Sequence, residues 1–157
     1  MRFPIPLAVL ALALGATSLH AQAKPIVAFP DKMTWGPAPA ILPAGAQLSV
    51  LEGDPTKAGP YTMRLSMPDG YRIPPHFHPG VEHVTVVEGT FLVGMGGKFD
   101  SAKLTALPTG TFAALQPGMQ HFAEAKGTTV IQLHGTGPWS MTYVNPADTP
   151  KAQAQSE

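Results

Sequence analysis

The sequence contains no cysteine among its 157 residues. This absence excludes disulfide bonds, thiolate metal ligands, a thiol nucleophile and lipid attachment through cysteine. Stability must therefore come from packing, to which a bound metal ion can add. Charged residues are also few, at 13% of the chain, and Lys and Arg together equal Asp and Glu at 10 each. No basic stripe is available for nucleic acid or for an anionic membrane.

Long apolar runs are absent except at the N-terminus. There, Arg2 precedes an apolar stretch over residues 7–16, and the tripeptide Ala-Gln-Ala follows at residues 21–23. This layout is typical of a secretory signal peptide with its cleavage site, and the run is too short to span a bilayer. An uncleaved anchor helix is the alternative. We therefore expect removal of residues 1–23, a periplasmic or secreted protein, and no membrane contact after cleavage.

No segment combines helical periodicity with capping residues over ten or more positions. Instead, 18 prolines and 16 glycines separate short runs rich in Val, Thr, Leu, Phe and Tyr. Such runs favour an antiparallel sandwich or barrel. The expected strands lie within residues 46–52, 61–67, 81–89, 90–95, 110–115, 129–134 and 139–144. In the second of them, Tyr61, Met63, Leu65 and Met67 share one face, and Thr62, Arg64 and Ser66 share the other.

The length of the chain predicts a single domain. After the signal peptide, residues 24–44 are rich in proline and are expected to form an irregular arm around the body. Residues 45–145 hold the strand pattern and form the predicted barrel domain. Residues 146–157 are expected to be a flexible tail.

Three of the six histidines lie close together in one glycine- and proline-rich segment. Residues two apart in a strand point to the same side, so His76 and His78 form a pair. A turn at residues 79–80 lets Glu82 return to that side, which brings two imidazoles and a carboxylate together. His83 has the opposite parity and is not expected to be a ligand.

A fourth candidate ligand, His121, follows the turn QPGMQ. If the strand before that turn pairs beside the first, His121 completes a set of three imidazoles and one carboxylate. Mixed nitrogen and oxygen ligation suits divalent Fe, Mn, Zn, Ni or Cu. We therefore expect one divalent metal ion per chain, with a histidine-rich surface strand as the alternative.

The spacing of these residues is similar to that of the cupin superfamily. Its first motif is Gly, five residues, His-x-His, three or four residues, Glu, six residues, Gly. In this chain Gly70, His76, His78, Glu82 and Gly89 match every position of that motif.

The second motif of the superfamily is matched in part. Gly110, Gly118 and His121 keep their spacing, whereas Pro117 stands one residue late and Ala125 replaces an asparagine. The resemblance implies an all-β fold with little helix, namely a single cupin β-barrel (a double-stranded β-helix or jelly roll). It also implies a metal held by His76, His78, Glu82 and His121, with a degenerate cupin whose metal site is vestigial as the alternative.

Four further residues are candidates for catalysis or substrate binding. Gln132 and His134 alternate along one strand, so both can face the cavity, with a surface position as the alternative. Arg64 can clamp a carboxylate if it lies in the pocket. Glu88 has the parity of Glu82 but lies next to a turn glycine, which favours a rim position over a general base. Phe77, Phe91, Phe112, Phe122, Met63 and Trp139 are expected to pack in the core or to line the pocket.

The resemblance also suggests a function. Three imidazoles and one carboxylate around an octahedral metal leave two adjacent positions for substrate, water or dioxygen. In cupins this arrangement resembles that of dioxygenases, oxalate-degrading enzymes and some isomerases. We therefore expect an exported, metal-dependent, dioxygenase-like oxidoreductase that acts on a small oxygenated molecule. The alternatives are a non-catalytic, metal-dependent module that binds a small ligand, and an isomerase or sugar-modifying cupin. A homodimer paired through edge strands is a further expectation.

Overall fold

The computed structural model describes residues 24–151, so the expected signal peptide (residues 1–23) and residues 152–157 of the expected tail lie outside the described part. In chain order the elements are η1 (Pro30–Lys32), β1 (Gly36–Pro37), β2 (Gln47–Glu52), β3 (Gly59–Met67), β4 (Arg72–Phe77), β5 (Glu82–Met95), η2 (Ser101–Lys103), β6 (Thr105–Pro108), β7 (Phe112–Leu115), β8 (His121–Gly137), β9 (Thr142–Tyr143) and η3 (Pro146–Asp148).

Helix is scarce in the part of the chain that the structure describes. It consists of the 3-10 turns η1, η2 and η3, each three residues long. None of these turns has the length or apolar character that crossing a membrane requires. The expected strand-rich fold with little helix is therefore confirmed.

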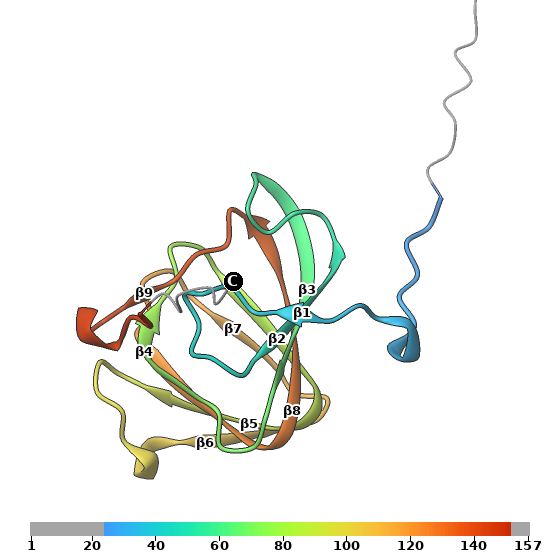
Figure 1. Ribbon diagram of the computed structural model, residues 1–157. Helices are drawn as coiled ribbons and strands as arrows, with labels where there is room; N and C mark the ends of the chain where they lie inside the picture. Colours follow the sequence, from blue (N-terminus) through green and yellow to red (C-terminus); the bar gives the residue numbers. More distant parts are fainter. Residues whose placement is uncertain (1–23, 152–157) are drawn as a thin grey trace, which may run out of the picture.

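Antiparallel pairing joins the strands into one curled sheet. One path runs β1-β2-β3-β8-β4-β9, and β5 pairs with β6, β7 and β8. The long strands β5 and β8 pair from His83 opposite His134 to Met95 opposite His121. Because both strands bend along their length, they contribute to both walls of a barrel whose strands curl around a common interior (Figure 1). The expected single β-barrel is thus confirmed.

The inner face of β3 follows the alternation seen in the sequence. Tyr61, Met63, Leu65 and Met67 are 4%, 1%, 2% and 1% exposed, whereas the residues between them are only partly buried. Every second side chain of a strand points to one face, so an apolar residue at each such position buries a continuous stripe. Removing this stripe from water is a main source of the barrel's stability.

A bulge at Gly89 allows β5 to bend between the two walls. The register between β5 and β8 shifts on both sides of Glu88, and Gly89 has a φ of +74°. A Cβ at Gly89 would lie 2.4 Å from the carbonyl oxygen of Thr128, so only glycine fits there without rearrangement. The two strands expected at residues 81–89 and 90–95 are therefore one bent strand.

Of the five aromatic residues expected in the core or the pocket wall, two are buried, Phe77 and Trp139 are partly buried, and one is exposed. Phe91 is 5% exposed inside the barrel, and Phe122 is fully buried beside the ring of Phe99. Phe112 is 58% exposed, so its expected place in the core is wrong. It pairs with Thr85 of β5 on the outer face, where a short strand leaves it uncovered.

The segment before β2 closes one side of the barrel interior. The hydroxyl of Tyr143 donates to the carbonyl of Ile41 at 2.7 Å, and the hydroxyl of Tyr71 donates to the carbonyl of Pro43. Leu42 between them is 5% exposed and belongs to the core. Residues 24–32, in contrast, lead away from the barrel (Figure 1).

Candidate metal centre

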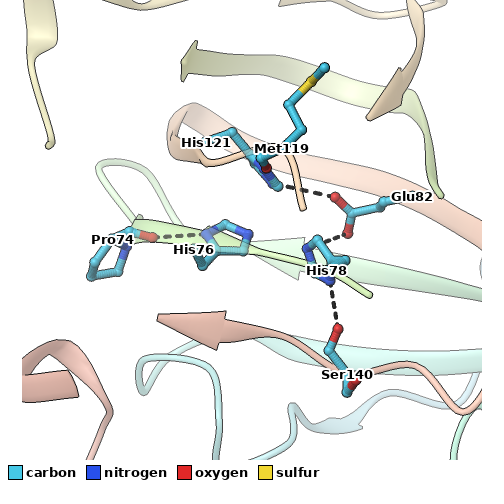
Figure 2. A network of polar contacts seen from close by, with 7 residues as sticks. All are labelled: Pro74, His76, His78, Glu82, Met119, His121 and Ser140. Atoms are coloured by element: carbon cyan, nitrogen blue, oxygen red, sulfur yellow. Dashed lines mark hydrogen bonds and ion pairs between the residues drawn. The ribbon is translucent and has the colours of Figure 1, made fainter. Parts of the chain in front are cut away.

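Three strands bring the four expected ligands to one place. His76 lies near the end of β4, and His78 follows just after that strand. Glu82 begins β5 and His121 begins β8. Across β4 and β8, His76 stands opposite His121. Their side chains converge inside the barrel (Figure 2), and we refer to these four residues as the histidine cluster.

The members of the cluster are close together and buried. The possible ligand nitrogens of the three histidines lie within 4.8 Å of one another. The Oε1 and Oε2 atoms of Glu82 lie 3.4 Å from Nε2 of His78 and 3.5 Å from Nε2 of His121, respectively. Exposure is 3% for His76, 5% for His78, 8% for Glu82 and 3% for His121.

Backbone carbonyls orient all three imidazoles (Figure 2). Nδ1 of His76 donates to Pro74 O at 2.8 Å, and Nδ1 of His121 donates to Met119 O at 2.9 Å. Nδ1 of His78 donates to Ser140 O at 2.7 Å. A carbonyl oxygen can only accept, so each neutral ring carries its proton on Nδ1 and leaves a lone pair on Nε2. Histidines that bind metals usually have this arrangement.

The electrostatics of the cluster keep His76 neutral and Glu82 ionised. Burial lowers the pKa of His76 to about 3, and repulsion from His121 adds to this effect. Burial alone would raise the pKa of Glu82, but a hydrogen bond from His121, and the positive charge that His78 and His121 carry when protonated, outweigh burial and keep that pKa below its usual value. An anionic carboxylate beside imidazoles, each of which offers a lone pair when neutral, is a donor set for a divalent cation.

One contact tests directly whether the cluster fits a metal. Nε2 of His78 is buried and finds no hydrogen-bond partner within residues 24–151, although Glu82 Oε1 is only 3.4 Å away. With the proton of His78 on Nδ1, both of these atoms are acceptors. Two acceptors that face each other in a buried site repel, unless a cation or a proton lies between them. The cluster therefore fits the binding of a metal ion.

The cavity beside the cluster is small and apolar. Its volume is about 20 Å³. This is room for about one water molecule. Apart from the cluster, its lining consists of apolar side chains and one indole, with Leu65, Phe91, Trp139 and Met141 among them.

Gln132 and His134 lie outside this cavity, which corrects the expectation that they face it. Ile131 and Leu133 of β8 line the cavity, so the residues that alternate with them point to the outer face. The imidazole of His134 stacks on that of His83, with ring centres 4.8 Å apart and an angle of 8°. His83 thus lies on the outer face, as its parity predicts.

Arg64 and Glu88 are also remote from the cluster. Nε of Arg64 donates to Oε1 of Gln132 at 3.1 Å on the outer face, and its guanidinium also contacts the sulfur of Met33 at 3.4 Å. Arg64 therefore does not clamp a ligand in the cavity. Glu88 is exposed at the bulge of β5, which agrees with a rim position rather than that of a general base.

Two features of the site escaped the sequence interpretation. The carbonyl of Ser140 orients His78 from 62 residues away, and a main-chain acceptor leaves no mark in residue type. Trp139 was expected in the core or the pocket wall, but its contact with a ligand was not foreseen. Its ring centre lies 5.8 Å from that of His78. The one signal was its position as the first residue of the last expected strand.

Comparisons with known proteins agree with this fold. Residues 23–140 match a family model described as the ChrR cupin-like domain. No match was found among curated proteins. A protein from Methylibium petroleiphilum, provisionally named an acetylacetone dioxygenase, is 20% identical with a TM-score of 0.61, covering 85% of this chain and 90% of that one.

Two further solved structures are similar. An RmlC-like cupin from Shewanella frigidimarina is 15% identical with a TM-score of 0.55, covering 72% of this chain and 91% of that one. The polyketide cyclase RemF from Streptomyces resistomycificus is 13% identical with a TM-score of 0.61, covering 79% and 88%. At these identities the likeness shows a shared fold alone.

Proposed function

Because the chain belongs to the ChrR cupin-like domain family, we propose that it is an exported, metal-dependent oxidoreductase of the dioxygenase type that acts on a small oxygenated molecule. The observation that carries this proposal is the buried, unpartnered Nε2 of His78, which faces the carboxylate of Glu82 at 3.4 Å. His76, His78, Glu82 and His121 would hold one divalent ion. A redox-active ion such as iron or manganese, when bound there, would supply electron transfer between substrate and dioxygen.

The chain's own residues would orient the metal ligands, shield the site from water and select small head groups. The carbonyls of Pro74, Met119 and Ser140 keep the three imidazoles aimed at one point. The apolar lining keeps bulk water away from that point, which strengthens the electrostatic interactions inside the cavity. The small free volume beside the cluster favours small head groups.

The composition of the lining bears on the reaction class. Apart from the histidine cluster, no titratable side chain lines the cavity in the described part of the chain. Isomerases and sugar-modifying enzymes need an acid or a base beside the substrate carbon, so the lining disfavours these alternatives. Oxidative cleavage directed by a metal needs no separate acid or base, and neither does binding without turnover.

The second candidate is therefore a non-catalytic module that binds a small ligand through its metal. The same absence of a separate acid or base favours it. The metal content of protein purified from its native compartment is the first measurement. Oxygen uptake is then recorded for the iron, manganese and zinc forms with a panel of diketones, diols, phenols and thiols. The name of the Methylibium protein motivates including β-diketones in that panel.

We expect the iron or manganese form to consume oxygen with one class of compound and the zinc form to be inert. If no metal form consumes oxygen or alters a compound, yet one compound binds tightly, the binding module is correct and the oxidoreductase is excluded.

A further inference from the structure

A larger cavity adjoins the small cavity beside the histidine cluster. This cavity, which we call the apolar groove, is lined by Ile41, Leu48, Met63, Trp139 and Met141, among others. Its volume, measured in the same way as that of the small cavity, is about 310 Å³. The cavity at the cluster offers only about 20 Å³. A molecule of several heavy atoms therefore cannot be accommodated beside the cluster alone, whereas the apolar groove has room for it.

The two cavities share a wall. Trp139 and Met141 line both of them, so these side chains form the partition between the apolar groove and the cluster. The indole of Trp139 also lies against the ring of His78, at 5.8 Å between centres. Movement of the partition would join the two spaces at a metal ligand.

Hydrogen bonds hold the backbone of the partition, whereas the indole nitrogen of Trp139 has no such bond to the described residues. The amide of Trp139 donates to Pro55 O at 2.7 Å, and the carbonyl of Ser140 accepts from His78. The indole Nε1, in contrast, is buried with no hydrogen-bond partner among the described residues. No hydrogen bond to the described residues therefore fixes the orientation of the indole. A buried N–H without a partner is unfavourable, so an oxygen of a bound molecule would satisfy it.

We propose that the apolar groove is the tail subsite for this protein's ligand and that Trp139 is its gate. The ligand class is a molecule with two neighbouring oxygens at one end and an unbranched apolar tail. The oxygens lie at the histidine cluster, the tail occupies the apolar groove, and the indole N–H of Trp139 donates to a ligand oxygen. This inference rests on the proposed function, because it assigns the oxygens to a bound metal.

A series of β-diketones of increasing length tests the proposal. The metal-loaded protein is titrated with 2,4-pentanedione, 2,4-heptanedione and 2,4-nonanedione in a Trp35→Phe background. Since the chain has two tryptophans, the emission of that variant reports on Trp139 alone. Each methylene that enters an apolar site tightens binding about fourfold. We expect affinity to rise along the series by on the order of a hundredfold or more, with a shift in the emission of Trp139.

Three variants locate the effect. Ile41→Trp fills the apolar groove and is expected to abolish the gain in affinity with chain length. Leu107→Trp is the matched control, because Leu107 packs on the core from β6 and lines neither cavity. Trp139→Phe keeps a ring but removes the N–H. In calorimetry it should weaken every diketone severalfold and leave the gain per methylene unchanged.

The outcomes separate this inference from the proposed function. If metal binds and 2,4-pentanedione supports oxygen uptake, but affinity stays flat along the series, the tail subsite is wrong and the function stands. If affinity rises with length in a protein that holds no metal, the subsite stands and the metal-dependent function fails. Equal nonanedione affinity in Ile41→Trp and the parent overturns the subsite. If no diketone binds, the subsite is also overturned. This is the result expected if a second copy of the chain fills the groove.

Discussion

At the residue scale, the chemistry of the cluster depends on which nitrogen each imidazole leaves free. Carbonyl acceptors at Nδ1 leave the three Nε2 atoms free, and those of His78 and His121 face the carboxylate of Glu82. Neighbouring residues whose side chains point to the outer face of the strand do not belong to the cluster. His83, next to Glu82 in the chain, stacks on His134 on the outer face of the barrel.

Removing a single ligand should therefore remove the metal. We expect His76→Ala, His78→Ala and His121→Ala each to weaken metal binding by more than about a hundredfold, because loss of even an outer partner of a ligand costs 10- to 100-fold. Glu82→Gln should also weaken it, since a neutral amide is a poorer donor to a cation. Metal content after dialysis measures the effect. His83→Ala is the control and should retain its metal; loss of metal in that variant but not in His121→Ala would refute the ligand assignment.

Acid should destabilise the metal-free protein through His76. Burial lowers the pKa of this group from 6.5 to about 3 in the folded state. Below pH 6.5 the unfolded chain takes up a proton at this position while the folded chain does not. The free energy of unfolding should thus fall from about pH 6.5 towards pH 3. Urea unfolding with a chelator present measures it. His76→Gln, which cannot titrate, should show a shallower decline, and identical slopes would count against this account.

Much of the ligand geometry could be predicted from the sequence, because strand parity is a local property. His76 and His78 on one side and His83 on the other follow from spacing alone. The outer position of Gln132 was also available in principle, since Ile131 and Leu133 alternate with it. The carbonyl of Ser140 was not predictable, because its contact with His78 depends on a chain path that no residue type encodes.

At the element scale, the bends of the long strands bring the site together. β5 carries Glu82 into the interior at one end and, past the bulge at Gly89, pairs with the start of β8 at the other. Local patterns show where apolar residues alternate, but they do not show that two runs separated by a glycine form one strand. Local patterns also do not reveal β6 (Thr105–Pro108), because this strand ends in proline and is mostly exposed, so no apolar alternation marks it.

The bulge should be sensitive to a single methyl group. In Gly89→Ala the new Cβ would lie 2.4 Å from Thr128 O, at a φ of +74°. Backbone strain of this kind costs about 1–3 kcal/mol, and we expect a loss of that order in the free energy of unfolding. Chemical denaturation measures it. Gly36→Ala is the control, because a Cβ added at Gly36 would have no atom within 4 Å other than those of residues 35–37 in the described part of the chain. Equal stability of the two variants would mean that the bulge relaxes freely.

At the scale of the whole molecule, the site occupies the interior of a barrel that has no disulfide bonds, since the chain lacks cysteine. Export remains a prediction, because residues 1–23 lie outside the described part. We expect the exported protein to begin at Lys24, since small residues at 21 and 23 fit the cleavage positions. Intact-mass measurement of secreted or periplasmic material tests this start. A mass that still includes the apolar run would overturn it.

Association through sheet edges is the remaining prediction at this scale. The edge strands β1, β6, β7 and β9 are two or four residues long. Short edges offer few main-chain bonds to a partner, so we expect an edge-paired homodimer to dissociate on dilution. Light scattering over a concentration series should give twice the chain mass at high concentration. A monomer at every concentration would exclude the dimer.

The acceptors that aim the imidazoles have a consequence for how this protein tolerates genetic change. They are main-chain carbonyls of Pro74, Met119 and Ser140, and the side chains of Met119 and Ser140 are exposed. Replacing either side chain leaves the carbonyl in place. Coding changes can therefore accumulate at these two positions while the rings keep their aim. In a saturating mutational scan, substitutions of Met119 and Ser140 would be silent, although their carbonyls orient the site, whereas substitutions of His76, His78, Glu82 and His121 would stand out.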